Sequence, residues 1–289
     1  MSDIAVRREG RALGMGLVMA SALVFSLAGV LTKMIQADAW TIACWRGLVG
    51  GVLIAAYVAW ADRGQPLRQT FRLGWPGWLL ASVGSLASLA FIFAFKLTYV
   101  ANVAVIYATA PFVAAGLGWW LMRETPAGRT LIAALFSFVG VVTVVAGGLG
   151  AGSIAGDTVA LAMTFGCALY MVLIRRFRDT PVVWAGGVSG LQLCVVGAFV
   201  VDPLAVSPQD AVLLALFGLS FAVAVVLWTE GTKLIPASES GLLGTAETPF
   251  AILLAWLVLA ELPPLASFVG GGIVLAAVFA HALRDMRSA

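Results

Sequence analysis

The stretch APFVAAGLGWWLMRETPAG, residues 110–128, has a near copy in TPFAILLAWLVLAELPPLA, residues 248–266. Both run from Pro-Phe through about a dozen mostly apolar residues to a glutamate and then a proline. Upstream, FKLTYVANVAVIYATAPFVA (95–114) aligns with TKLIPASESGLLGTAETPFA (232–251), which pairs Lys96 with Lys233. Inserting one residue then pairs Pro111 with Pro249. The shared order of Lys-Leu, Pro-Phe and Glu indicates an internal repeat rather than chance similarity of apolar sequence.

Composition indicates that this chain of 289 residues lies in a lipid bilayer. It is 62% hydrophobic and 11% charged, with a mean hydropathy of +1.03, whereas soluble domains carry roughly 25% charged residues. Ten apolar stretches are long enough to cross a bilayer. They are residues 12–34, 40–60, 75–95, 100–121, 129–148, 157–174, 182–201, 210–231, 238–260 and 265–283. The sequence therefore predicts an all-α integral membrane protein with ten transmembrane helices.

Positive charges gather in alternate loops, and such an excess is typical of the cytoplasmic side. With a cytoplasmic N-terminus, that side holds Arg7, Arg8, Arg11, Arg63, Arg68, Arg72, Arg123, Arg129, Arg175, Arg176, Arg178, Lys233, Arg284 and Arg287. The other side holds Lys33 and Lys96 beside Asp38, Asp157, Asp202, Asp210 and Glu261. This distribution predicts that both termini are cytoplasmic. The net charge of +3 reflects topology and does not indicate nucleic-acid binding.

The two copies lie in the fourth and ninth spans and must cross the membrane in opposite directions, because five is an odd number of spans. The chain is thus expected to form a five-plus-five inverted repeat with halves 1–148 and 149–289. The Gly-rich connector AGGLGAGSIAG, residues 146–156, is expected to join them. Inverted repeats place a substrate site near the bilayer midplane and operate by alternating access.

The first two spans carry further motifs. ASALVFSLAGVLTKM (20–34) ends the first span with a lysine, and WTIACWRGLVGGVL (40–53) places an arginine early in the second. With the paired Pro-to-Glu helices, this pattern resembles the drug/metabolite transporter superfamily, specifically its ten-helix EamA-type exporters. Within it the chain looks most like the aromatic amino-acid exporters of the YddG type. The resemblance covers essentially the whole chain and implies ATP-independent export of amino acids or related metabolites across a bacterial inner membrane. The sequence departs from a symmetric pattern at Arg46, which has no basic counterpart in the seventh span.

Residues that would support catalysis or cofactor binding are missing from the sequence. There is no phosphate-binding Gly-x4-Gly-Lys-Ser/Thr loop, no His-Glu-x-x-His motif and no convincing Ser-His pairing. The one histidine, His281, lies at the end of the last span. Cys44, Cys167 and Cys194 are far apart in apolar stretches and are interpreted as small buried residues. We therefore expect no enzyme activity, no metal and no cofactor.

Glu247 is the strongest candidate for a binding residue, because a charge in the middle of a span is costly and by default functional. Pro111 and Pro249 are expected to kink their helices and to free the carbonyls of Tyr107 and Thr245 from their helical partners. Two free carbonyls and a carboxylate would suit an ammonium group. The alternative is that Glu247 is protonated and bonded to a neighbouring hydroxyl.

Other polar and aromatic residues within the spans complete the predicted site. Thr109 is the repeat equivalent of Glu247. The remaining candidates for substrate contact are Asn102, Ser240, Tyr170 and Trp228. Arg46 and Lys33 are candidates for charged contacts with a substrate, but the favoured interpretation of both is helix anchoring.

The function favoured by these features is secondary export of amino acids, with membrane lipid and a small-molecule substrate as the partners. A different substrate of the same superfamily, such as a drug or a sugar derivative, is the first alternative. A membrane-embedded enzyme or receptor is a second one, disfavoured by the short loops.

Overall fold

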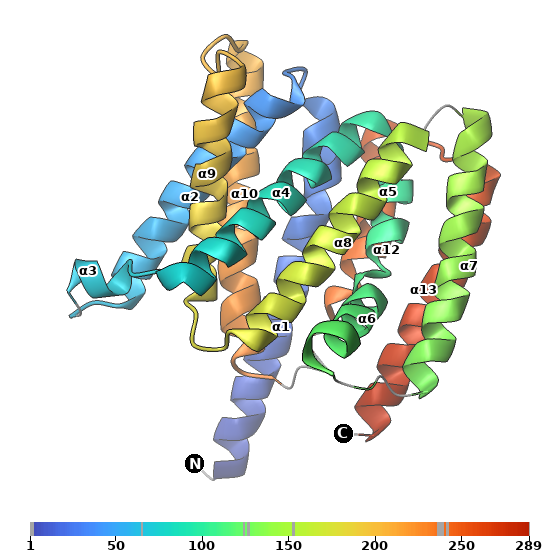
Figure 1. Cartoon of the computed structure of the whole chain (residues 1–289), viewed down its shortest axis with the longest axis horizontal. Helices are drawn as coiled ribbons and strands as arrows, with labels where there is room; N and C mark the ends of the chain where they lie inside the picture. The colour runs from blue at the N-terminus through green and yellow to red at the C-terminus, as the bar shows by residue number, and fades with distance from the viewer. Residues whose placement is uncertain are drawn as a thin grey trace.

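The computed structural model describes residues 3–64, 66–123, 125, 128–151, 154–235, 240 and 243–288. Across these residues the regular secondary structure is entirely helical (Figure 1). A helix satisfies its own backbone hydrogen bonds, which an apolar chain needs in lipid. The first half contains α1 (Asp3–Met34), α2 (Ala39–Ala61), α3 (Leu67–Thr70), α4 (Gly74–Leu97), α5 (Val100–Tyr107), α6 (Ala110–Met122) and α7 (Gly128–Ala151). The second contains α8 (Ile154–Arg176), α9 (Val182–Val200), α10 (Pro208–Thr232), α12 (Glu247–Leu259) and α13 (Leu265–Ser288).

The predicted membrane architecture is confirmed. Within the described residues, eight spans are long and apolar enough to cross a bilayer, with α5 and α6 together forming one of them. Two shorter apolar helices, at 247–259 and 265–281, complete a set of ten arranged as five plus five. The expected Gly-rich connector is mostly helical instead, because α7 continues through Ala151 and α8 begins at Ile154.

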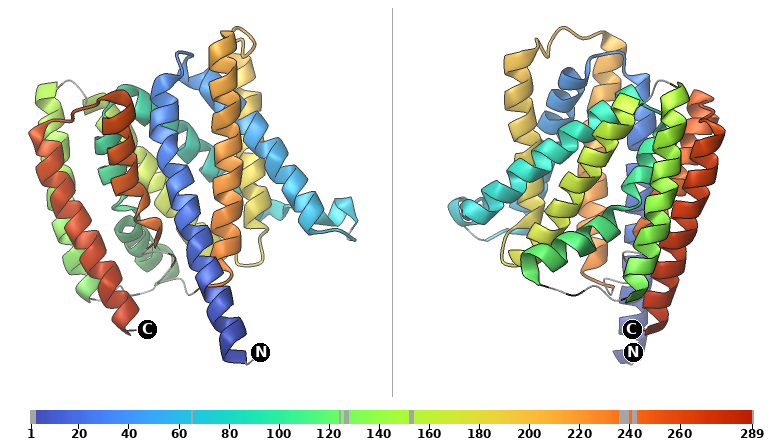
Figure 2. Two further views of the ribbon diagram at one scale, coloured as in Figure 1. Left: turned by 180° about the vertical axis from the view of Figure 1, so that it is seen from behind. Right: turned by 45° about the vertical axis from the view of Figure 1, so that its right-hand side comes forward.

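The packing of the helices repeats when the two halves are exchanged. α2 packs on α9 and α7 on α13, and each of these pairs joins equivalent helices. α4 packs on α8, and its counterpart α10 packs on α1. Figure 2 shows α1 running beside α10, and α7 beside α13. The repeat is therefore visible in the tertiary contacts as well as in the sequence.

Two helix crossings depend on glycine. A Cβ on Gly47 would lie 2.1 Å from the carbonyl oxygen of Gly190, where α2 meets α9. A Cβ on Gly140 would lie 2.6 Å from the carbonyl oxygen of Gly270, where α7 meets α13. Small residues let backbones approach this closely in membranes, where packing rather than hydrophobicity drives helix association.

Both termini lie at one end of the helix bundle (Figure 1), which we name the terminal end; the opposite end is the far end. At the far end the Nζ of Lys96 donates to the carbonyl of Ile35 at 2.5 Å, and the N–H of Gln36 donates to Asp210 at 2.9 Å. The second bond joins the first half to the second. At the terminal end, the Tyr57 hydroxyl donates to Glu230. Hydrogen bonds therefore join the two halves at both ends of the bundle.

Candidate functional site

The fourth and ninth spans are both interrupted near their middle. α5 ends at Tyr107 and α6 begins at Ala110, while residues 245–246 form a turn before α12 begins at Glu247. Pro111 is the second residue of α6 and Pro249 the third of α12. A proline in a first helical turn loses little, because the N–H at that position has no helical acceptor. The two prolines therefore lie in the first turns of new helices, so the predicted disturbance takes the form of a break between two helices.

The carbonyl groups at the two interruptions differ. Among the described residues no donor reaches the carbonyl of Tyr107, as predicted from Pro111. The carbonyl of Thr245 instead accepts the N–H of Thr248 at 3.3 Å. The prediction of a free carbonyl at Thr245 is therefore wrong, because the turn supplies a bond one residue shorter than the helical one.

Glu247 lies at the start of α12 and lines a small internal cavity of about 10 Å³. The other lining residues come from α1, α4, α5, α8 and α12. They are Phe25, Ser26, Gly29, Phe91, Phe95, Val103, Ala104, Tyr107, Met163, Thr248 and Ala251. A cavity of this size has room for about one water molecule. Four aromatic rings and both halves of the repeat surround it.

The carboxyl group of Glu247 has no hydrogen-bond or ion-pair partner among the residues that the structure describes. Its position in the first turn of α12 places it at the positive end of the helix dipole, which favours a negative charge. An unpaired carboxyl group in the interior is costly unless a partner arrives. The alternative interpretation, a carboxyl bonded to a neighbouring hydroxyl, is not what the described residues form.

Two of the predicted residues lie near Glu247 or near the turn that precedes it. Tyr107 lines the same cavity as Glu247. The ring of Trp228 packs on Gly244, next to Thr245, since a Cβ there would lie 2.7 Å from it. An aromatic side chain therefore lies at each interruption, Tyr107 at the end of α5 and Trp228 beside Gly244.

Other predicted residues lie away from this cavity. Thr109 donates its hydroxyl to the carbonyl of Ile106 at 2.6 Å, within its own span. Tyr170 packs between α4 and α9, where its ring lies against Gly84. Ser240 is buried. Lys33, in the last turn of α1, interacts electrostatically with Glu261 at the far end.

Asn102, the third residue of α5, belongs to a buried polar network at the far end of the bundle. It donates to Asp157 at 3.0 Å and accepts the hydroxyl of Ser267 at 2.5 Å, while Thr98 donates to Asp157 at 2.6 Å. Asn102 and Asp157 are completely buried. The network joins α5 to α8 and α13, so Asn102 connects the two halves and does not line the cavity of Glu247. The sequence placed Asp157 at the first position of the span 157–174, and only packing shows that it is buried.

Glu261 lies just beyond α12 and accepts the N–H of Val100 at 2.6 Å. Burial raises the pKa of Glu261 above its usual range, although Lys33 and the Val100 bond act in the opposite direction. The residue thus fastens the beginning of α5 to the end of α12.

Arg46 lies in the interior between α2, α4 and α10 and is 7% exposed. Its guanidinium carbon lies 5.3, 5.1 and 4.2 Å from the ring centres of Phe91, Phe217 and Phe221. Its Nη1 donates to the hydroxyl of Ser88 at 2.5 Å. The sequence singled out Arg46 but did not predict which residues surround it, because they lie 42 to 175 residues further along the chain.

Two of the three cysteines lie close together in space although they are far apart in the sequence. The Sγ atoms of Cys44 and Cys194 lie 3.1 Å apart where α2 crosses α9. Cys167 lies on α8 and packs, like Phe91 and Tyr107, against one apolar core cluster. The described residues hold no group of three or more His, Cys, Asp or Glu that could bind a metal ion.

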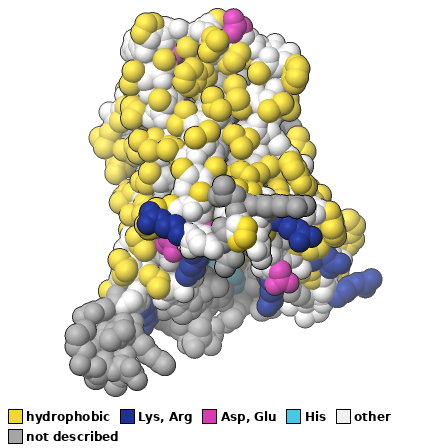
Figure 3. All heavy atoms as spheres, turned by 90° about the vertical axis from the view of Figure 1, so that its left-hand side faces the viewer, with side chains coloured by type: hydrophobic (Ala, Val, Ile, Leu, Met, Phe, Trp, Pro, Cys, Tyr) yellow, Lys and Arg dark blue, Asp and Glu magenta, His cyan; other side chains and the backbone are white. Residues whose placement is uncertain are grey.

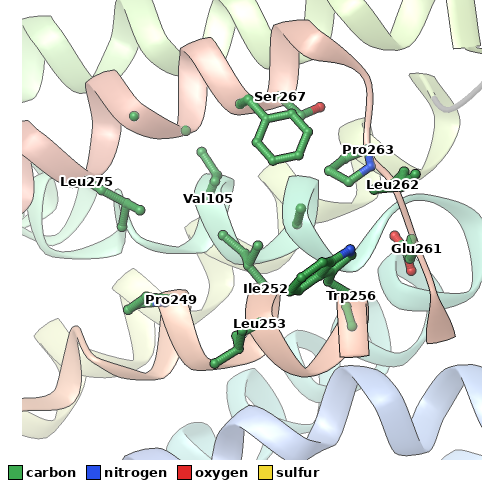
Figure 4. A pocket seen from close by; sticks show the side chains of 15 residues that line it. Val105, Pro249, Ile252, Leu253, Trp256, Glu261, Leu262, Pro263, Ser267 and Leu275 are labelled. Carbon is green, nitrogen blue, oxygen red and sulfur yellow. The ribbon is translucent and has the colours of Figure 1, made fainter. Parts of the chain in front are cut away.

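A larger groove of about 440 Å³ opens beside α12 and α13 (Figure 4). Its walls are mostly apolar, and Ile252, Trp256 and Leu275 extend into it. Its two polar residues, Glu261 and Ser267, already bond to Val100 and Asn102. The groove therefore suits hydrocarbon better than an amphiphilic substrate, and the smaller cavity at Glu247 is the better candidate site.

Comparisons with known proteins agree with this architecture. No curated protein matches the chain. A solved structure described only as the crystal structure of a protein is similar over 95% of this chain and 98% of its own, with a TM-score of 0.68 and 19% identity. That likeness shows the fold alone. The model of the EamA-like transporter family matches residues 12–146 and again residues 154–282. Because these two matches cover most of the sequence, the chain belongs to the EamA-like transporter family, whose members are membrane transporters of the drug/metabolite type.

Proposed function

We propose that this transporter exports amino acids, aromatic and other neutral ones first, together with related small metabolites. The observation that carries the proposal is the unpaired carboxyl group of Glu247 on an aromatic-lined cavity between the two halves. The resemblance of the sequence to YddG-type exporters favours the same substrate class.

An amino acid matches this site in charge and in polarity. Its ammonium group has three donors and no acceptor, and it would bind the carboxylate of Glu247 and the free carbonyl of Tyr107. Its side chain would meet Phe25, Phe91 and the Tyr107 ring, which line the cavity. Since the cavity has room for about one water, the helices around it must separate to admit a substrate, as alternating access requires.

The distribution of charge supports transport across a bacterial inner membrane with both termini in the cytoplasm. Figure 3 shows apolar side chains over most of one face, with Lys and Arg side chains gathered near one end. Both termini lie at a common end of the bundle (Figure 1), and an excess of Lys and Arg is typical of cytoplasmic loops.

The test is downhill transport by the purified full chain in proteoliposomes without nucleotide. Vesicles are loaded with labelled phenylalanine or with labelled N-acetylphenylalanine, which lacks the ammonium group. We expect phenylalanine to leave about tenfold faster than its acetylated analogue, because a hydrogen bond to a charged group contributes roughly 1.5–3 kcal/mol.

Equal rates for the two compounds would show that the site does not recognise the ammonium group. Transport of drugs or sugar derivatives without any transport of amino acids would assign the protein to another substrate class. A strict requirement for ATP would contradict secondary transport itself.

A further inference from the structure

Arg46 is a buried cation without a counterion. It forms no ion pair among the described residues, and its Nε, also buried, has no hydrogen-bond partner. Its one hydrogen-bond acceptor among the described residues is the neutral hydroxyl of Ser88. Arginine cannot relieve this by losing its proton, so the charge remains and needs an anion.

The three phenylalanine rings around Arg46 stabilise its buried positive charge only in part. Their faces attract the guanidinium by cation–π interaction, and the ring of Phe221, with its centre 4.2 Å away, is the nearest. A ring face accepts no strong hydrogen bond, however, and a guanidinium has five N–H donors in a planar fork suited to a carboxylate. The surroundings hold the cation in place and leave most of its donors unused.

The position of Arg46 connects it to the cavity of Glu247. Phe91 lies under the guanidinium and also lines that cavity. Arg46 comes from the first half and Glu247 from the second, so a molecule that engages both would hold the two halves together.

From these observations we propose that Arg46, with Ser88 and its three phenylalanine neighbours, is a binding subsite for the carboxylate of the substrate. This inference rests on the proposed function and adds to it. The substrates are zwitterions, with the ammonium group at Glu247 and the carboxylate at Arg46. Compounds that carry the ammonium group alone are poor substrates.

The experiment compares labelled phenylalanine with labelled phenylalaninamide, which keeps the ammonium group and lacks the carboxylate. Both are measured in proteoliposomes at about pH 6, where an α-amino group is protonated. The wild-type protein is expected to move the acid about tenfold faster than the amide, since a site with buried donors rejects an analogue that cannot pair them. Arg46→Gln is expected to bring the two rates within about threefold of each other by slowing only the acid.

Two further variants separate binding from helix anchoring. Arg46→Lys keeps the charge but loses the planar fork, so it should reduce the ratio of acid to amide only partly. Arg63→Gln is the matched control, because Arg63 also lies over an aromatic ring, Trp60, but is exposed at the terminal end. It should leave the ratio unchanged.

The wild-type measurement needs no variant to fold and can overturn the inference by itself. If the wild-type protein moves acid and amide equally, Arg46 binds no substrate carboxylate, and the proposed function survives. An unchanged ratio in a folded Arg46→Gln protein has the same meaning. If neither compound is transported and N-acetylphenylalanine is not either, the inference and the proposed function are both overturned.

Discussion

The fourth and ninth spans share one backbone design and carry different chemistry. Each breaks near its middle and starts again with a proline in the first turn, at Pro111 and at Pro249. At the break the fourth span has Thr109, whose hydroxyl bonds to its own chain, and the ninth has Glu247, whose carboxyl group has no partner in the described residues. The repeat thus supplies two discontinuous helices, while the charge that would bind a ligand occurs in one copy.

The two halves therefore contribute different charged residues to the interior. The first half contributes Arg46 and the second contributes Glu247. Inverted symmetry is enough to create two access routes to one site. A substrate with two different charges is itself asymmetric, so a site that orients it gains nothing from having each charge twice.

The largest expected effect on transport comes from replacing the residues at the two breaks, Glu247 and Thr109. Glu247→Gln should slow the export of phenylalanine about tenfold, because a charge-assisted hydrogen bond becomes a neutral one. Thr109→Val should leave the rate within about twofold, because its hydroxyl bonds to the carbonyl of Ile106. Initial rates in proteoliposomes measure both. Thermal unfolding of each purified variant checks that it is folded, and equal losses in the two folded variants would contradict the asymmetry.

A second prediction compares Asn102 in the fourth span with Ser240 in the ninth, another buried polar residue of the predicted site. Asn102→Ala should reduce the free energy of unfolding by about 1–3 kcal/mol, because it leaves Ser267 without its acceptor and takes a donor from buried Asp157. Ser240→Ala removes a single buried hydroxyl and should cost less.

The measurement for this pair is thermal or denaturant unfolding in detergent. Thr143→Ala is the neutral control, because that hydroxyl is exposed and bonds to Val139 in its own helix. If Ser240→Ala destabilises the protein more than Asn102→Ala, the far-end network does not anchor α5 as inferred.

The smallest expected effect concerns the helices that should stay still while the broken spans move. Oxidation of Cys44 and Cys194 by a copper–phenanthroline catalyst and oxygen should form a disulfide, since their Sγ atoms lie 3.1 Å apart. Each thiol loses a proton and the pair gives two electrons to the oxidant. Mass spectrometry should detect the cross-link, and Cys44→Ser should abolish it.

Transport by the cross-linked protein should remain within about twofold of the untreated rate. Gly47 and Gly190 already bring α2 and α9 into backbone contact, and such close packing leaves little room for sliding. A cross-linked protein that no longer transports would show that the crossing of α2 and α9 moves during the cycle.

Much of the fold could be predicted from sequence, because a bilayer imposes simple rules on a chain. Lengths of apolar sequence predicted the ten spans, and the odd spacing of the Pro-Phe copies predicted their inversion. Proline chemistry predicted a disturbance near Tyr107 and Thr245. It did not predict whether the helix bends or ends, because the answer depends on which neighbouring groups replace the lost bond.

The sequence by itself determined that this is a ten-span membrane protein, and it singled out Glu247 and Arg46 as residues too costly to bury without a reason. Only the tertiary structure decided which of the other polar residues are already paired. It joined Asn102 to Asp157 and Ser267, and it surrounded Arg46 with three phenylalanine rings and with no acid from the described part of the chain. The physical reason is that burial depends on local composition, whereas pairing depends on contacts between segments that lie far apart in the chain and meet only after the helices have packed.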